Sequence, residues 1–85
     1  MGQYWLVVTV RYFAAARAAA GVTDERAEAP TLAALLEQLS ATRGQRLADV
    51  LVMASFLVDG LAWHDHEAAL PPGATVDILP PFAGG

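Results

Sequence analysis

The sequence predicts an α+β domain in which a mixed sheet of four or five strands carries one main helix packed on one face. Three observations lead to this prediction. Residues 4–13 (YWLVVTVRYF) are rich in β-branched and aromatic side chains, which is typical of a strand. Residues 31–42 follow the apolar i, i+3, i+4, i+7 spacing of a helix. Residues 75–79 alternate in polarity and end at a double proline, which cannot continue a strand.

The first predicted strand has two different faces, because successive side chains point to opposite sides of a sheet. One face is wholly apolar and consists of Tyr4, Leu6, Val8, Val10 and Tyr12. The other is mixed and consists of Trp5, Val7, Thr9, Arg11 and Phe13. We expect the apolar face to point into the core and the mixed face to be partly exposed to water.

Short segments connect this strand to the main helix. Residues 14–21 (AAARAAAG) combine high helix propensity with a glycine stop, which predicts a short helical turn. Residues 23–29 are polar and predict an edge strand that pairs back with the first strand. Pro30 and Thr31 then open the main helix. Its apolar stripe consists of Leu32, Leu35, Leu36 and Leu39.

The second half of the chain returns to strands. After Gly44, residues 46–51 predict a turn or a second helical piece. Residues 55–58 and 61–63 predict two strands joined by Asp59-Gly60, a pair typical of a tight hairpin turn. An irregular segment and an LPPG turn lead to the last strand. We therefore expect one domain over residues 1–80 and a flexible tail over 81–85.

The composition limits the possible functions. The 85 residues are 55% hydrophobic and 16% charged, which is typical of a folded domain. The absence of cysteine excludes a disulfide framework and a cysteine nucleophile. Nucleic-acid binding is not expected, because the net charge is −4 and no basic stripe is present. No apolar run is long enough for a membrane span, and no signal peptide is visible, so we expect a cytoplasmic protein.

Candidate catalytic and metal-binding residues are few. His64 and His66 could present two imidazoles to a metal, but no third ligand is in view, so solvated histidines are the better interpretation. The serines lack the glycine pattern that surrounds a nucleophilic serine. Asp59 is explained by its turn and Asp49 by a solvated helix face. We expect no metal site and no catalytic machinery of the chain's own.

The C-terminal segment LPPFAGG is the exception. Pro80 and Pro81 restrict φ and form a semi-rigid exit from the sheet. Gly84 and Gly85 have no Cβ, so they can enter a channel too narrow for side chains. The α-carboxylate of Gly85 is ionised at neutral pH and becomes an acyl donor after attack on the α-phosphate of ATP. A glycine-rich end can also be merely frayed, and the residues alone leave both interpretations open.

The sequence resembles the MoaD family of ubiquitin-like sulfur carriers, the small subunits of molybdopterin synthase, over nearly its whole length. The resemblance rests on the opening strand with YFAAARAAAG, on TLAALLEQL, FLVDG and LPPGATVDILPP, and on the terminal FAGG. The double proline before the glycines is closer to this family than to the carriers of the thiazole pathway. The turn PPGATV departs from the Gly-Asp pair common in the family, which affects a turn and not the chemistry. The resemblance implies a β-grasp fold, in agreement with the strand and helix order.

The resemblance also implies that Gly85 carries sulfur and that partner proteins load and use it. A MoeB-like E1 enzyme would use ATP and Mg²⁺ to adenylate Gly85, and a sulfurtransferase-derived persulfide would convert the adenylate into a thiocarboxylate. A MoaE-like large subunit would accept the tail and pass its sulfur to cyclic pyranopterin monophosphate, building the dithiolene of molybdopterin. The tail contacts would be Pro81, Phe82, Ala83 and Gly84. The chain itself would bind no cofactor and would not be an enzyme on its own.

Two further surfaces follow from the same resemblance. Phe82 is expected to seat in an apolar pocket at the mouth of the partner's channel; the alternative is that it packs back on its own domain. The uncovered sheet face would supply apolar contact area for both partners. Its candidate residues are Trp5, Val7, Phe13 and Leu79. A one-residue error in strand register would reverse this assignment.

Other functions stay open. A sulfur carrier for cysteine or thiamine biosynthesis would use the same tail chemistry. A ubiquitin-like protein modifier would also need an adenylated Gly85, but it would form isopeptide bonds with lysines of target proteins. The absence of lysine from the chain argues only against chains built on itself. An interaction domain with an inert tail is the third alternative.

Overall fold

The computed structural model describes residues 7–81. This part of the chain forms five strands and three helices. In chain order they are β1 (Val7–Tyr12), α1 (Ala15–Ala20), β2 (Asp24–Glu28), α2 (Leu32–Arg43), α3 (Gln45–Met53), β3 (Ser55–Val58), β4 (Leu61–Ala62) and β5 (Thr75–Leu79). The strands make one sheet in the order β2-β1-β5-β3-β4.

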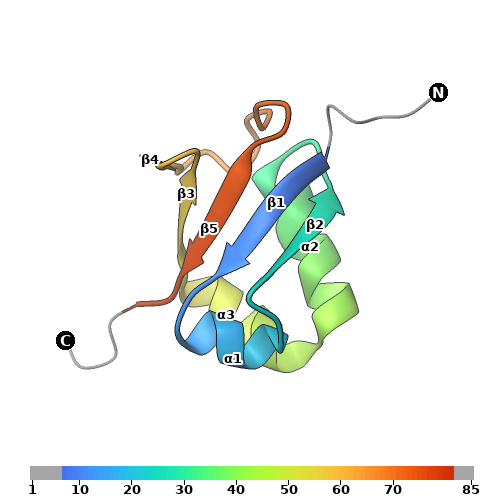
Figure 1. The fold of residues 1–85 in the computed structure, drawn as a ribbon, viewed down its shortest axis with the longest axis vertical. Helices are drawn as coiled ribbons and strands as arrows, with labels where there is room; N and C mark the ends of the chain where they lie inside the picture. The colour runs from blue at the N-terminus through green and yellow to red at the C-terminus, as the bar shows by residue number, and fades with distance from the viewer. Residues whose placement is uncertain (1–6, 82–85) are drawn as a thin grey trace.

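The last strand lies in the middle of the sheet (Figure 1). β5 pairs in parallel with β1, where Thr9 faces Thr75 and Tyr12 faces Ile78. On its other side β5 pairs antiparallel with β3. The outer strands β2 and β4 are each the antiparallel partner of the strand next to them. The mixed sheet is therefore confirmed, with β2 at an edge as its polar sequence predicted.

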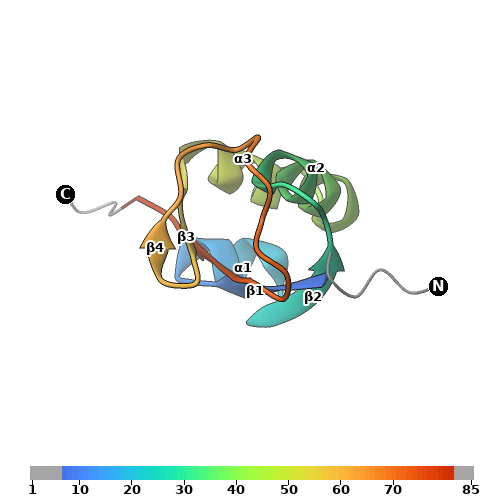
Figure 2. The same cartoon turned by 90° about the horizontal axis from the view of Figure 1, so that it is seen from above.

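Helices cover one face of this sheet and leave the other face open (Figures 1 and 2). The sequence predicted one main helix, α2, and the structure adds α3 as the second helical piece, directly after Gly44. α1 contributes Ala16 and Ala20 to the core. The buried leucines of α2 and α3 are Leu32, Leu35, Leu39, Leu47 and Leu51, while Leu36 of the predicted stripe is partly buried. The cover of the sheet is thus shared among three helices of the described chain.

Local sequence explains where α2 and the β3–β4 hairpin begin. The Thr31 hydroxyl accepts a hydrogen bond from the Ala34 N–H at 3.1 Å and caps α2, in the way short polar side chains cap helices. In the hairpin, Asp59 and Gly60 have φ angles of 50° and 84°, the left-handed geometry of a tight two-residue turn. The Asp59 carboxylate also accepts from the Thr75 N–H at 2.9 Å. The predicted turn role of Asp59 is confirmed.

The core lies between the apolar side of the sheet and the helices. Val8, Val10 and Tyr12 of β1 are at most 2% exposed, as the alternation of the first strand predicted. Tyr4 and Leu6, predicted on the same face, lie outside the described residues. β3 and β5 add the buried side chains of Phe56, Val58, Val76 and Ile78.

A polar cluster closes the core where β1, β2 and the end of α2 meet. The Tyr12 hydroxyl donates to the Glu25 carboxylate. Arg43 donates to the same carboxylate at 3.0 and 2.7 Å, and to the Ala20 carbonyl at 3.4 Å. The hydrogen bond from Arg43, with a further one from Tyr12, lowers the pKa of Glu25 despite its partial burial. The pKa of Tyr12 is raised, chiefly by burial and then by its bond to Glu25. The cluster ties the three elements together.

Replacing Glu25 with Gln is expected to lower the free energy of unfolding by about 1–2 kcal/mol, because Arg43 loses its charged acceptor. Urea unfolding at neutral pH measures this change. Glu28→Gln is the matched control, since Glu28 is exposed on the same strand. An equal loss in both variants would contradict the assigned role of the cluster.

The ion pair of Glu25 and Arg43 also predicts that the stability of the domain depends on pH. The folded-state pKa of Glu25 lies below its unfolded value of about 4.3, so its contribution is fully present above that pH. The contribution is lost as the pH falls through the folded-state pKa. The difference in melting temperature between the wild type and Glu25→Gln should therefore shrink in acid. A gap that stays constant between pH 7 and the acid range would show that Glu25 is not the titrating group.

Candidate functional site

The tail leaves the sheet from its central strand (Figure 1). β5 ends at Leu79, and Pro80 and Pro81 have no N–H with which to extend a ladder. Pro81 is exposed. The other predicted tail residues, Phe82, Ala83, Gly84 and Gly85, lie outside the described residues. The structure therefore fixes where the tail begins, next to the end of β1 and the start of β3.

Phe13 and Leu79 meet at this exit. The Phe13 N–H donates to the Ile78 carbonyl at 3.2 Å, which sets Phe13 beside the last residue of β5. A turn holds it there, because the Ala16 N–H donates to the Phe13 carbonyl at 3.0 Å and Ala14 adopts a positive φ of 50°. The Phe13 side chain is 36% exposed, whereas Leu79 is only partly exposed. Together they give the exit an apolar border.

Val7, another predicted face residue, is not brought to the exit. Val7 lies at the opposite end of β1, paired with Glu28, roughly 20 Å from Phe13 at about 3.3 Å per residue. Trp5 lies outside the described residues. Only part of the predicted apolar surface therefore gathers where the tail begins.

The centre of the open face is polar. Arg11 donates from Nε and Nη2 to the two carboxylate oxygens of Asp77 at 2.6 and 2.9 Å. Asp77 is 7% exposed, and among residues 7–81 it is the only charged residue that is buried. Thr9 and Thr75 are paired on the same two strands, two positions before Arg11 and Asp77. The open face is thus apolar at the tail exit and carries an ion pair in the middle.

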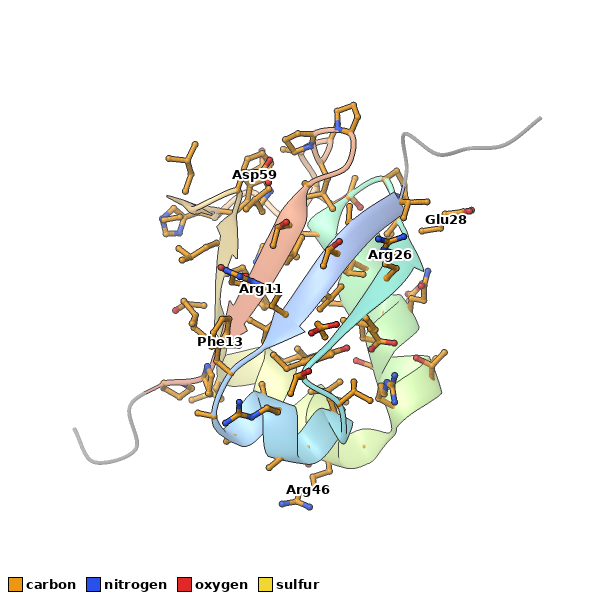
Figure 3. The ribbon with its side chains drawn as sticks, viewed as in Figure 1. Arg11, Phe13, Arg26, Glu28, Arg46 and Asp59 are labelled. Atoms are coloured by element: carbon orange, nitrogen blue, oxygen red, sulfur yellow. The ribbon has the colours of Figure 1, made fainter. Side chains whose placement is uncertain are left out.

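The ion pair is joined to the exit through the aromatic ring of Phe13. The guanidinium carbon of Arg11 lies 5.6 Å from the centre of that ring, a cation–π distance (Figure 3). The hydrogen bond to Asp77 raises the pKa of Arg11, which therefore stays charged. Arg11 is fixed on both sides, while half of its side chain (52%) is exposed.

Sequence reasoning placed Arg11 on the mixed face but did not identify its partnership with Asp77. The two residues are 66 positions apart, and their contact depends on the register of a parallel strand pair. A single charged residue inside each of two largely apolar strands was the available indication. Aspartate is disfavoured in strands, so an Asp in a central strand points to a partner that satisfies it.

The two histidines follow β4, which forms one edge of the sheet. His64 and His66 are exposed, and His66 contacts Phe56 edge-on with ring centres 5.6 Å apart. They border a shallow cavity of about 260 Å³ beside β3 and Trp63. No group of three metal-ligating side chains occurs within residues 7–81. Asp49 is exposed on α3 and accepts from Gln45, in agreement with its predicted solvated position.

The profile of the ThiS family matches residues 10–85. This match covers most of the chain, from β1 to the terminal glycine. The chain belongs to the ThiS family. No curated protein sequence matches the chain.

Solved structures agree with this membership. A putative molybdopterin converting factor subunit 1 from Pyrococcus furiosus matches this ThiS-family chain with 25% identity and a TM-score of 0.77, covering 89% of this chain and 98% of that one. SAMP1 of Haloferax volcanii matches with 21% identity and a TM-score of 0.79, covering 93% and 99%. Subunit 1 in a complex of subunits 1 and 2 of the Helicobacter pylori molybdopterin-converting factor matches with 22% identity and a TM-score of 0.71, covering 93% and 99%.

The predicted β-grasp fold is therefore confirmed, and the chain has the architecture of the ubiquitin-like sulfur carriers. The resemblance to MoaD-type proteins found in the sequence is also confirmed at the level of the family and its structural neighbours. Within residues 7–81, none of the helices has the length and hydropathy needed to cross a membrane.

The ion pair on the open face gives a stability prediction. Arg11→Leu alone should lower the free energy of unfolding by about 1–3 kcal/mol, because it leaves the buried Asp77 carboxylate without its partner. The double variant Arg11→Leu/Asp77→Val should recover most of that loss, since an apolar pair can replace an ion pair at little cost. Urea unfolding of both variants checks this, and equal stabilities of the two would contradict it.

Proposed function

We propose that this chain is a sulfur carrier that supplies sulfur for the dithiolene of molybdopterin. The observation that carries the proposal is the sequence PPFAGG following directly on the central strand of a ThiS-family β-grasp domain. The exit is bordered by the exposed ring of Phe13, which gives a partner an apolar contact where the tail begins. Sulfur chemistry would take place at the Gly85 carboxyl group, in the cytoplasm.

The proposed chemistry needs two partner enzymes to load the carrier. In the first step a Gly85 carboxylate oxygen attacks the α-phosphate of ATP on a MoeB-like enzyme, and pyrophosphate leaves. In the second step the terminal sulfur of a sulfurtransferase-derived persulfide attacks the acyl carbon and AMP leaves. A thiol then reduces the S–S bond of the acyl persulfide and frees the thiocarboxylate. The chain contributes the acyl group and its presentation; Mg²⁺ and ATP are bound by the partner.

The short tail limits where a partner can sit. Four residues follow Pro81, and an extended chain of that length spans at most roughly 14 Å. A protein that takes Gly85 into its active site must therefore contact the domain around the exit. We propose that a MoaE-like large subunit does so, accepting Pro81, Phe82, Ala83 and Gly84. The Helicobacter pylori neighbour, described in complex with its subunit 2, supports a partner of this kind.

Two alternatives have support in the comparisons. Membership of the ThiS family leaves a sulfur carrier of another pathway open, and Haloferax volcanii SAMP1 is described as a small archaeal modifier protein. A sulfur carrier for thiamine or cysteine would form the same thiocarboxylate, whereas a modifier would form isopeptide bonds with target lysines. The double proline before Phe82 favours the molybdopterin assignment.

The decisive experiment measures intact mass after incubation with ATP, Mg²⁺, a MoeB-like enzyme and a persulfide-loaded sulfurtransferase. We expect one oxygen to be replaced by sulfur, and the product to react with a thiol alkylating reagent. Because the chain has no cysteine, alkylation can report only the new thiocarboxylate. A variant lacking Gly85 should remain unmodified.

The possible outcomes of this experiment distinguish the candidate functions. An unchanged mass with an activating enzyme proven on its own substrate would overturn the carrier function. High-mass adducts with target proteins would favour the modifier. If the thiocarboxylate forms, sulfur transfer to cyclic pyranopterin monophosphate in the presence of the large subunit distinguishes the molybdopterin pathway from thiamine and cysteine synthesis.

A second prediction concerns the exit itself. Phe13→Ser should weaken binding of the large subunit about tenfold or more, because an aromatic anchor at the centre of a contact is lost. Val52→Ser is the matched control, since Val52 is 81% exposed on α3, away from the open sheet face. Titration calorimetry with each variant tests this. Equal affinities of the two variants would show that the partner does not rest on Phe13.

A further inference from the structure

We infer that the Arg11 guanidinium, held in place by Asp77, is the specificity-determining contact for the protein that accepts the tail, and that this protein presents neutral oxygen acceptors opposite it. Such acceptors are main-chain carbonyls or side-chain amide oxygens. The inference rests on the proposed function, because it concerns the partner that receives Gly85. It adds a residue, and the chemistry of its partner, to the apolar contact at the exit.

The position of Arg11 places it within the contact. A partner that receives a tail of this length covers the exit, where the Phe13 ring lies 5.6 Å from the Arg11 guanidinium carbon. Arg11 lies on the face of the sheet that the helices leave open, and its side chain stands beside Phe13 in Figure 3. Covering Phe13 therefore brings the partner's surface over Arg11 as well.

The Arg11 guanidinium has N–H donors that the ion pair with Asp77 does not use. Asp77 occupies Nε and one N–H of Nη2, and no residue among 7–81 accepts a hydrogen bond from Nη1. In the free protein water can satisfy these donors, since half of the side chain is exposed. Under an apolar partner surface they would be buried without acceptors, which weakens binding for each donor left unpaired. A partner with correctly placed oxygens avoids that cost, so Arg11 selects between the two kinds of surface.

The charges around Arg11 favour neutral acceptors. Asp77 binds it in a bidentate arrangement, and Asp24 of β2 lies opposite it in the strand register. Asp77 already neutralises the charge of Arg11, and a carboxylate brought up to Arg11 would be repelled by both aspartates. A carbonyl or amide oxygen carries no such penalty.

Asp77 acts as a positioning residue. Its carboxylate is nearly buried and uses both oxygens to orient the guanidinium plane, and the ring of Phe13 lies against the guanidinium. A side chain already fixed in the free protein loses little conformational entropy on binding. The ion pair thus pre-organises the remaining donors toward the partner.

The test is titration calorimetry with a purified MoaE-like large subunit from the same organism. The double variant Arg11→Leu/Asp77→Val removes the pair and leaves an apolar centre. Its affinity should fall at least tenfold, while its melting temperature stays close to that of the wild type and size-exclusion chromatography shows the same elution. Arg26→Leu is the matched control, since Arg26 is exposed on the edge strand β2 beside Thr9, away from Phe13 (Figure 3), and its affinity should change by less than about twofold.

A third variant separates directed hydrogen bonding from charge. Arg11→Lys keeps the positive charge but loses the planar fork, so it should lose affinity much as the double variant does. Equal or tighter binding by the double variant would overturn the inference while leaving the carrier function intact, because it would show a plain apolar contact. Affinity retained by Arg11→Lys would also overturn it. Failure of the wild-type chain to bind the large subunit would overturn the proposed partnership and this inference together.

Discussion

The parallel pairing of β1 with β5 is the constraint on which the rest of the molecule depends. It joins the two ends of the chain, setting Tyr12 opposite Ile78 and Arg11 opposite Asp77. Closing so long a loop costs conformational entropy, which the burial of Val10, Val76 and Ile78 helps to offset, since none of the three is measurably exposed. The pairing also places the start of the tail, because in this register β5 ends beside the end of β1.

One charged cluster lies on each side of this sheet. Tyr12 points toward the helices, where Glu25 and Arg43 complete its hydrogen bonding and tie α2 to the sheet. Its neighbour Arg11 points to the open side and joins Asp77. The first cluster stabilises the domain, and the second leaves donors exposed at the edge of the tail exit. Adjacent residues of one strand therefore belong to separate polar clusters, because a strand alternates its side chains between faces.

Much of this fold could be predicted from local sequence. The hairpin at Asp59-Gly60, the strand at residues 75–79 and the helix opened by Thr31 each depend on residues close together in the chain, and each appears at the predicted position. The register of β1 against β5 could not be predicted, because it depends on long-range packing. The ion pair of Arg11 and Asp77 was missed for that reason. The residues of the tail alone left its role open, and its sulfur chemistry was predicted from the resemblance to the MoaD family; residues 82–85 lie beyond what the structure describes.

The central place of β5 also has a mechanical consequence. Tension between the start of β1 and the end of β5 acts along both strands, because they run in the same direction side by side. Such a pull loads the hydrogen bonds between them together, in shear, instead of opening them one after another. A partner or an unfolding machine that grips the tail and draws it away from the N-terminal strand would therefore meet the most resistant part of the sheet first.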